Sequence, residues 1–144
     1  AVIVNQHTAS AAEIVAACLQ DHHRAVVVGE RTYGKGTVQE VIDLDKECGA
    51  MKITTASYWR PSGKTIQRPR EPDAHATWGV SPDEGYKVAL KSEDQNRWRQ
   101  WRVRRDVCPP PAGLEPFEDR PLLRAADYVE KEASTKSPLP PGEG

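Results

Sequence analysis

Residues 1–28, AVIVNQHTASAAEIVAACLQDHHRAVVV, decide the fold that this sequence predicts. Residues 1–4 and 25–28 are apolar runs typical of buried strands. Between them a helix is predicted over residues 11–20, where apolar side chains recur at helical spacing: Ile14, Val15, Cys18 and Leu19. Two strands joined by one helix pair in parallel through a right-handed crossover, so this stretch predicts a βαβ unit.

The following residues predict a β-hairpin. Residues 29–36 form a loop with three glycines, and residues 37–44 and 51–59 are rich in the β-branched side chains of strands. Turn-forming residues at 45–49 separate the two strands, which favours an antiparallel pair. A last short strand is predicted at residues 86–90. Together with a short C-terminal helix, these elements predict an α/β fold with a mixed sheet.

The composition changes beyond residue 90. Eight of the twelve prolines lie in the final 36 residues, which predicts a polar linker there. An apolar stripe between residues 122 and 129 interrupts this linker and predicts a short docked helix. Residues 137–142 are predicted to be disordered.

Charge, hydropathy and cysteine content exclude several classes of protein. Lysines and arginines number 20 and acidic residues 21, a formal charge of −1, so no polyanionic partner is expected overall. No apolar run approaches the roughly 18 residues that a membrane helix needs. Cys18, Cys48 and Cys108 lack a C-x-x-C pair, which disfavours a disulfide framework or a thiolate zinc site. The chain begins without Met in a strand-like run, so we interpret its first residue as an internal cut.

Ser10 has two interpretations. Ser10 and Glu13 form the S-x-x-E pattern of a capping box just before an apolar helix, and the pattern alone favours this structural role. In the second interpretation Ser10 lies at a strand-to-helix turn, where the Ala11 amide and the positive end of the helix face whatever bonds to its hydroxyl. That placement suits a nucleophile, provided that a base lies nearby.

Lys35 lies in a glycine-rich loop that does not suit a nucleotide. Residues 29–35 match G-x-x-x-x-G-K, but Gly36 stands where Ser or Thr should hold magnesium, and a strand follows where a helix should. Lys35 and Gln39 are four residues apart, so an extended chain can place them on one face. With Ser10 they offer a nucleophile, an amine base and an amide that orients the amine. The alternative is a solvated loop lysine.

The histidines and one arginine-rich segment carry weaker signals. The four histidines, His7, His22, His23 and His75, lie in no metal-ligating frame, so no metal site is predicted.

Residues 97–105 hold five arginines and two tryptophans, side chains that can stack on single-stranded nucleic acid. An amphipathic surface helix that packs its tryptophans is favoured, and no nucleic-acid partner is expected.

Two motifs resemble the carboxyl-terminal processing, or tail-specific, proteases of peptidase family S41. Residues 4–16, VNQHTASAAEIVA, are similar to the nucleophile turn of that family, and residues 28–39, VGERTYGKGTVQ, are similar to its lysine loop. Lys35 follows Ser10 by 25 residues and Gln39 follows Lys35 by four, as in the Ser-Lys-Gln arrangement of the family.

Weaker matches extend this resemblance along the chain. Residues 79–83, GVSPD, resemble a Gly-Ile-x-Pro-Asp element of the family, and residues 119–129 resemble its closing helix. At the position two before the nucleophile the family often has Ser, whereas this chain has Thr8. The match thus covers roughly residues 1–90 and the closing helix.

The resemblance implies the C-terminal part of an S41 catalytic core, similar to the crotonase and Clp-protease spiral of ββα units. Residues 1–90 are then part of this core, and residues 91–118 are an Arg/Trp-rich and Pro-rich insert or linker. Residues 119–134 are the closing helix, and residues 135–144 are a disordered tail. Family members usually carry an upstream PDZ domain, a cap region and the first core strands, including a Gly-Gly turn that gives a second oxyanion amide.

The resemblance also implies a serine endopeptidase that cleaves protein or peptide substrates near their C-terminal tails. Ser10 would be the nucleophile, Lys35 the general base, Gln39 the residue that orients Lys35, and the Ala11 amide an oxyanion donor. No metal or organic cofactor is implied, and the expected location is the bacterial cell envelope or periplasm. The rival interpretation is a truncated, non-catalytic relative that binds peptides or a partner through residues 97–105.

Overall fold

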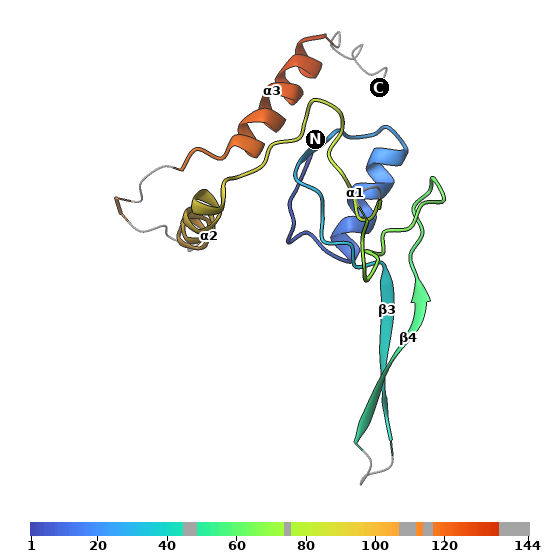
Figure 1. Cartoon of the computed structure of the whole chain (residues 1–144). Coiled ribbons are helices and arrows are strands. Elements are labelled where there is room, and N and C mark those ends of the chain that lie inside the picture. The colour runs from blue at the N-terminus through green and yellow to red at the C-terminus, as the bar shows by residue number, and fades with distance from the viewer. Residues whose placement is uncertain (45–48, 74–75, 107–111, 114–116, 136–144) are drawn as a thin grey trace, which may run out of the picture. The chain divides into compact units, whose positions relative to one another are not determined.

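The computed structural model describes residues 1–44, 49–73, 76–106, 112–113 and 117–135. These residues form a mixed α/β structure with small sheets and helices (Figure 1). The chain divides into two compact units, Val2–Lys87 and Val88–Gly144, the latter together with Ala1. All of the predicted catalytic residues lie in the first unit.

The first unit begins with the predicted βαβ arrangement. β1 (Val2–Val4) and β2 (Val27–Gly29) pair in parallel, and α1 (Ala11–Asp21) connects them. The expectation from residues 1–28 is therefore confirmed. The core of this unit is small and consists mainly of aliphatic side chains: Val4, Ala16, Ala17, Val27, Ile66 and Val80.

Helix α1 buries mainly small side chains. Its buried residues are Glu13, Ala16 and Ala17, whereas Val15 is 58% exposed and Cys18 is also exposed. The apolar periodicity located the helix, and of the four apolar residues that marked it Ile14 packs against the core. Alanines allow the helix to pack closely against the strands. The buried Glu13 carboxylate is stabilised by hydrogen bonds from main-chain amides and from the Thr32 hydroxyl.

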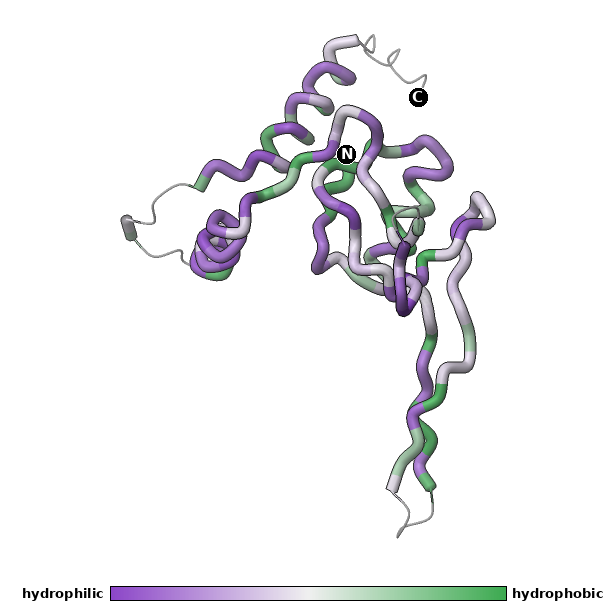
Figure 2. The backbone as a smooth tube through the Cα atoms, viewed as in Figure 1, coloured by the Kyte–Doolittle hydropathy of each residue, from purple (hydrophilic) through white to green (hydrophobic). Residues whose placement is uncertain are grey.

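The second pair of strands confirms the predicted hairpin. β3 (Thr37–Asp43) and β4 (Ala50–Ser57) are antiparallel, with a register shift between Val38 and Gln39 that leaves Thr55 of β4 as the additional residue. Hydrophobic and hydrophilic residues alternate along this ribbon (Figure 2), and every residue of β4 is exposed.

Two details of the sheet prediction were wrong. The described residues form two separate two-stranded sheets in place of one mixed sheet. The strand predicted at residues 86–90 is reduced to a single bridge between Gly29 and Lys87. The Gly29 amide also donates to the Tyr86 carbonyl oxygen at 3.0 Å, so the segment follows β2 only for this short length.

The second unit contains α2 (Ser92–Arg105) and α3 (Arg120–Thr135). Trp98 Nε1 donates to Asp119 Oδ2 at 2.9 Å, and Asp119 Oδ1 accepts the amide of Leu122 at 3.1 Å, so one carboxylate joins α2 to the first turn of α3. Helix α2 is mostly hydrophilic (Figure 2) and buries none of its residues.

No helix within the described ranges is long and apolar enough to span a membrane. The predicted disordered segment at residues 137–142 lies outside the described residues.

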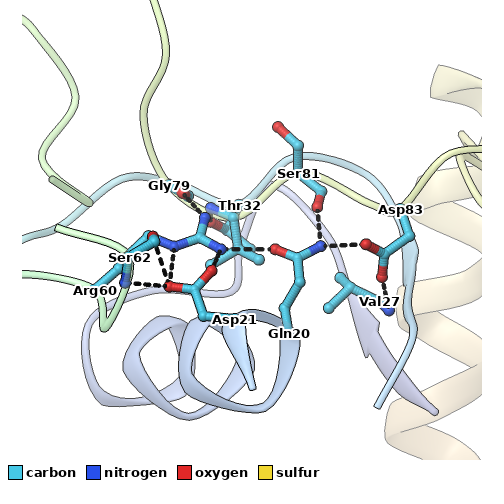
Figure 3. A network of polar contacts seen from close by, with 10 residues as sticks. Gln20, Asp21, Val27, Thr32, Arg60, Ser62, Gly79, Ser81 and Asp83 are labelled. Atoms are coloured by element: carbon cyan, nitrogen blue, oxygen red, sulfur yellow. Dashed lines mark hydrogen bonds and ion pairs between the residues drawn. The ribbon is translucent and has the colours of Figure 1, made fainter. Parts of the chain in front are cut away.

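A polar network holds the C-terminal end of α1 against the loops that follow β4 (Figure 3). The carboxylate of Asp21 accepts hydrogen bonds from the guanidinium of Arg60 and from the amide and hydroxyl of Ser62. The side-chain nitrogen Nε2 of Gln20 donates to Asp83 Oδ1 at 2.9 Å. The Arg60 hydrogen bonds hold the pKa of Asp21 well below its usual range, although burial acts in the opposite direction.

Candidate active site

Ser10 occupies a strained turn between β1 and α1. Its backbone has φ 57° and ψ −123°, a combination that residues with a side chain rarely adopt. The amides of Glu13 and Ile14 donate to the Ser10 carbonyl oxygen at 2.9 and 3.1 Å, so the helix starts directly at this residue. Holding a serine in such a conformation costs on the order of 1–3 kcal/mol. A serine on a strained strand-to-helix turn is typical of enzymes that use the hydroxyl as a nucleophile.

The first amide of α1 is free to bind an anion. The first N–H groups of a helix have no acceptor within the helix. Among the described residues, none accepts a hydrogen bond from the Ala11 N–H, and Ala11 is exposed. The positive end of the helix dipole also lies here. The turn therefore offers one donor beside the Ser10 hydroxyl.

Glu13 joins this turn to the lysine loop. Its side chain is completely buried and accepts four hydrogen bonds. Oε2 accepts the main-chain amides of Ser10 at 2.9 Å and Lys35 at 2.8 Å. Oε1 accepts the amide of Gly34 at 2.7 Å and the hydroxyl of Thr32. A carboxylate offers about four acceptor positions, so each one is used.

Thr32 supports the buried carboxylate from the other side. Its hydroxyl donates to Glu13 and accepts the amide of Val80 at 2.7 Å. The main chain of Gly79 passes so close that a Cβ there would lie 2.6 Å from Thr32 Oγ1 and 3.2 Å from Glu13 Oε1. Gly79 also has φ +59°, which favours glycine. The segment that resembles Gly-Ile-x-Pro-Asp thus closes over the Thr32–Glu13 pair.

The structure brings together the main chains of Ser10 and Lys35, which share the Oε2 atom of Glu13 as acceptor. The side chains of Lys35 and Gln39 are exposed. Within the described residues, the side chains of Ser10, Lys35 and Gln39 form no hydrogen bonds with one another. Their catalytic roles, and that of Ala11, therefore stay predictions.

Sequence reasoning assigned Glu13 only to a capping box and missed its contacts with the lysine loop. The hydrogen bond from the Ser10 amide to Glu13 is the part of that motif which was foreseen. A signal was nevertheless present, because Glu13 lies three and four residues before Ala16 and Ala17. A charged side chain on the buried face of a helix needs partners, since a glutamate is almost never fully buried without them.

A second carboxylate, Glu30, lies just after β2 at the start of the lysine loop. Partial burial raises its pKa, while the positive charges of His7 and Lys87 act to lower it. His7 belongs to the turn that leads to Ser10.

Within the described ranges, no group of three or more His, Cys, Asp or Glu side chains could hold a metal ion.

The βαβ unit, the Ser10 turn and the lysine loop all lie in a region that matches a known protein family. A family model described as peptidase family S41 matches residues 1–84. The chain belongs to peptidase family S41. The match covers β1 through the loop that closes over Glu13, so Ser10, Lys35 and Gln39 all lie within the S41 region.

Several curated proteins and one solved structure resemble this S41 chain. A carboxy-terminal-processing protease of Bartonella bacilliformis is 53% identical over 66 residues, which are 46% of this chain and 15% of that protein. A carboxyl-terminal-processing protease of Picosynechococcus is 42% identical over 98 residues, 62% of this chain and 23% of that protein. A structure titled photosystem II D1 C-terminal processing protease is 40% identical, with a TM-score of 0.49, over 62% of this chain and 20% of that one.

This chain therefore spans only a fraction of the length of the relatives it matches. A relative from Tetradesmus obliquus is 43% identical over 82 residues, 57% of this chain and 16% of that protein. Its name, chloroplastic C-terminal processing peptidase, shows that such proteins occur in chloroplasts as well as in bacteria.

Proposed function

We propose that this chain supplies the nucleophile and the general base of a serine endopeptidase of the C-terminal processing type. The observation that carries the proposal is the bridge made by Glu13. One buried carboxylate hydrogen-bonds both the Ser10 amide and the Lys35 amide, which are 25 residues apart in sequence. The bridge fixes the strained nucleophile turn to the lysine loop, as a Ser-Lys dyad requires. The names of the relatives do not favour a non-catalytic binding module.

In this mechanism the Ser10 hydroxyl attacks the carbonyl carbon of the scissile peptide, and a neutral Lys35 amine takes the hydroxyl proton. The Ala11 amide donates to the oxyanion that forms. Lys35 then returns the proton to the leaving amine as the C–N bond breaks, which leaves an ester on Ser10. Water hydrolyses the ester, with Lys35 again taking a proton and returning it to the serine oxygen.

Gln39 is proposed to orient the Lys35 amine. Its amide oxygen can accept from the amine without adding a negative charge, which would favour the ammonium form. Gln39 lies beside the register shift of the hairpin, close to the extra residue Thr55 of β4.

The wider organisation is proposed from the family. Residues 1–90 would belong to a core with the crotonase-like spiral of ββα units, residues 91–118 would be an insert, and residues 119–134 would be the closing helix. The substrates would be proteins cut near their C-terminal tails, recognised with the help of an upstream PDZ domain. The location would be the bacterial cell envelope.

The test is a chimera in which residues 1–84 replace the matched segment of the Picosynechococcus protease. We expect the chimera to hydrolyse a casein substrate, and Ser10→Ala or Lys35→Ala to abolish the hydrolysis. Gln39→Ala should lower kcat by about 10-fold to 100-fold, less than the roughly 100-fold to 10,000-fold that a proton-transfer group contributes, because Gln39 only orients the Lys35 amine. Hydrolysis that persists in a folded Ser10→Ala chimera would contradict the proposal.

A further inference from the structure

A pocket of about 430 Å³ lies beside the lysine loop, lined by residues from three segments of the first unit. Gln6 and His7 come from the nucleophile turn, Tyr33 from the lysine loop, and Arg68 and Trp78 from the segment after β4. The Arg31 side chain also lines it. The pocket thus combines an aromatic surface with two guanidinium groups.

Both guanidinium groups stack on one ring. The Cζ atom of Arg31 lies 4.4 Å from the centroid of the Trp78 ring, and that of Arg68 lies 5.2 Å from it. Stacking uses the faces of the guanidinium groups and leaves N–H donors at their edges. Arg31 is further fixed by hydrogen bonds to two neutral acceptors, the Ser81 hydroxyl and the Ala76 carbonyl oxygen.

The positive charge of this pair is not neutralised. In the part of the chain that the structure describes, neither Arg31 nor Arg68 forms an ion pair with a carboxylate. The two cations share one ring and so lie within about one Debye length, ~10 Å at 0.1 M salt, where they repel each other. An anion bound next to both groups would offset that repulsion and could accept donors from their edges.

The pocket adjoins the proposed catalytic residues. A Cβ on Gly34 would lie 2.5 Å from Trp78 Cδ1 and 2.8 Å from Arg68 Cβ, so both side chains pack on the main chain next to Lys35. The amide of Tyr33 donates to the Thr8 carbonyl oxygen at 2.9 Å, which joins the same loop to the turn before Ser10. A ligand in this pocket would therefore lie within a few residues of the scissile bond of a bound peptide.

We propose that Arg31, Arg68 and Trp78 form a subsite that binds a carboxylate of the peptide substrate. The inference rests on the proposed peptidase function and adds a substrate preference to it. The carboxylate is either the C-terminal α-carboxylate of the chain or the side chain of an Asp or Glu near the cleavage site. Both sources present the same planar group, which pairs with guanidinium donors.

The test measures binding, which does not depend on catalysis. Fluorescein-labelled peptides are titrated into the whole chain carrying Ser10→Ala, with fluorescence anisotropy as the readout. One peptide pair differs by a free or an amidated C-terminus, and a second pair differs by Glu or Gln within the sequence. We expect one pair to show at least tenfold tighter binding of the carboxylate form, and the pair that does so identifies the source.

Arg68→Gln is the decisive variant, because within the described residues the guanidinium of Arg68 lies over the Trp78 ring and forms no hydrogen bond or ion pair. It should reduce that preference to less than twofold, and Arg68→Lys should restore part of it. Arg70→Gln is the matched control, an exposed arginine that does not line the pocket, and it should leave the preference intact. Equal binding within both peptide pairs, or a preference that survives Arg68→Gln, would overturn the subsite.

Failure of the subsite and failure of the peptidase proposal are distinguishable. Hydrolysis by the chimera that depends on Ser10 but shows no carboxylate preference would reject the subsite and leave the peptidase. A carboxylate preference in binding, with hydrolysis that does not depend on Ser10, would reject the catalytic assignment and leave the subsite.

Discussion

Replacing Glu13 by glutamine tests how strongly one buried carboxylate holds the site together. The two side chains have the same shape, but glutamine has one acceptor oxygen and a donor nitrogen. If the nitrogen takes the place of Oε2, the amides of Ser10 and Lys35 both lose their acceptor. If it takes the place of Oε1, the Gly34 amide loses its acceptor and the Thr32 hydroxyl must rotate. Each buried donor left without a partner costs about 1–3 kcal/mol.

We therefore expect Glu13→Gln to lower the free energy of unfolding by about 2–4 kcal/mol, a large part of the 5–15 kcal/mol typical of a domain. The measurement is urea unfolding of the whole chain, followed by circular dichroism. Glu40→Gln is the matched control, because it makes the same chemical change on an exposed position of β3 and should stay within about 0.5 kcal/mol of the wild type. A Glu13→Gln value as small as the control value would refute the bridging role.

Two further predictions concern the surroundings of this site. Gly79→Ala should destabilise the chain by at least about 2 kcal/mol, because its Cβ would lie 2.6 Å from Thr32 Oγ1. Gly85→Ala, at a similar positive φ but with open space around it, should cost only about 1 kcal/mol in the same unfolding assay. Equal losses would contradict the close approach at Gly79. Stability should fall as the pH drops below about 4, because the pKa of Asp21 is lower in the folded than in the unfolded chain and its contribution is complete only above the unfolded value. Asp21→Asn should flatten the acid limb of melting temperature against pH; an unchanged limb would show that the Arg60 pair does not produce it.

The parts of the fold that the sequence predicted are those with local causes. The βαβ unit follows from two apolar runs and one helical segment, and the hairpin follows from β-branched residues on either side of a turn. The strand expected at residues 86–90 failed because pairing with β2 stops after one bridge, and no local pattern reports the length of a partner strand.

The sequence proposes residue types for the site but does not encode its geometry. Motif spacing selected Ser10, Lys35 and Gln39, whereas the role of Glu13 depends on donors 19 to 22 residues away. Contacts at such separations arise from tertiary packing, which periodicity does not encode. The Trp78 pocket has the same origin, because its residues come from three separate segments.

The central claim is that Ser10 is a nucleophile activated by Lys35. A fluorophosphonate probe, which forms a covalent bond with an activated serine, tests it most directly when the modified residue is located by mass spectrometry. We predict an adduct on Ser10 in the whole chain and in the chimera, with a labelling rate that falls at least 100-fold in Lys35→Ala and stays unchanged in Lys64→Ala, an exposed lysine outside the loop. An adduct on another residue, or undiminished labelling of Ser10 in a folded Lys35→Ala variant, would contradict the account.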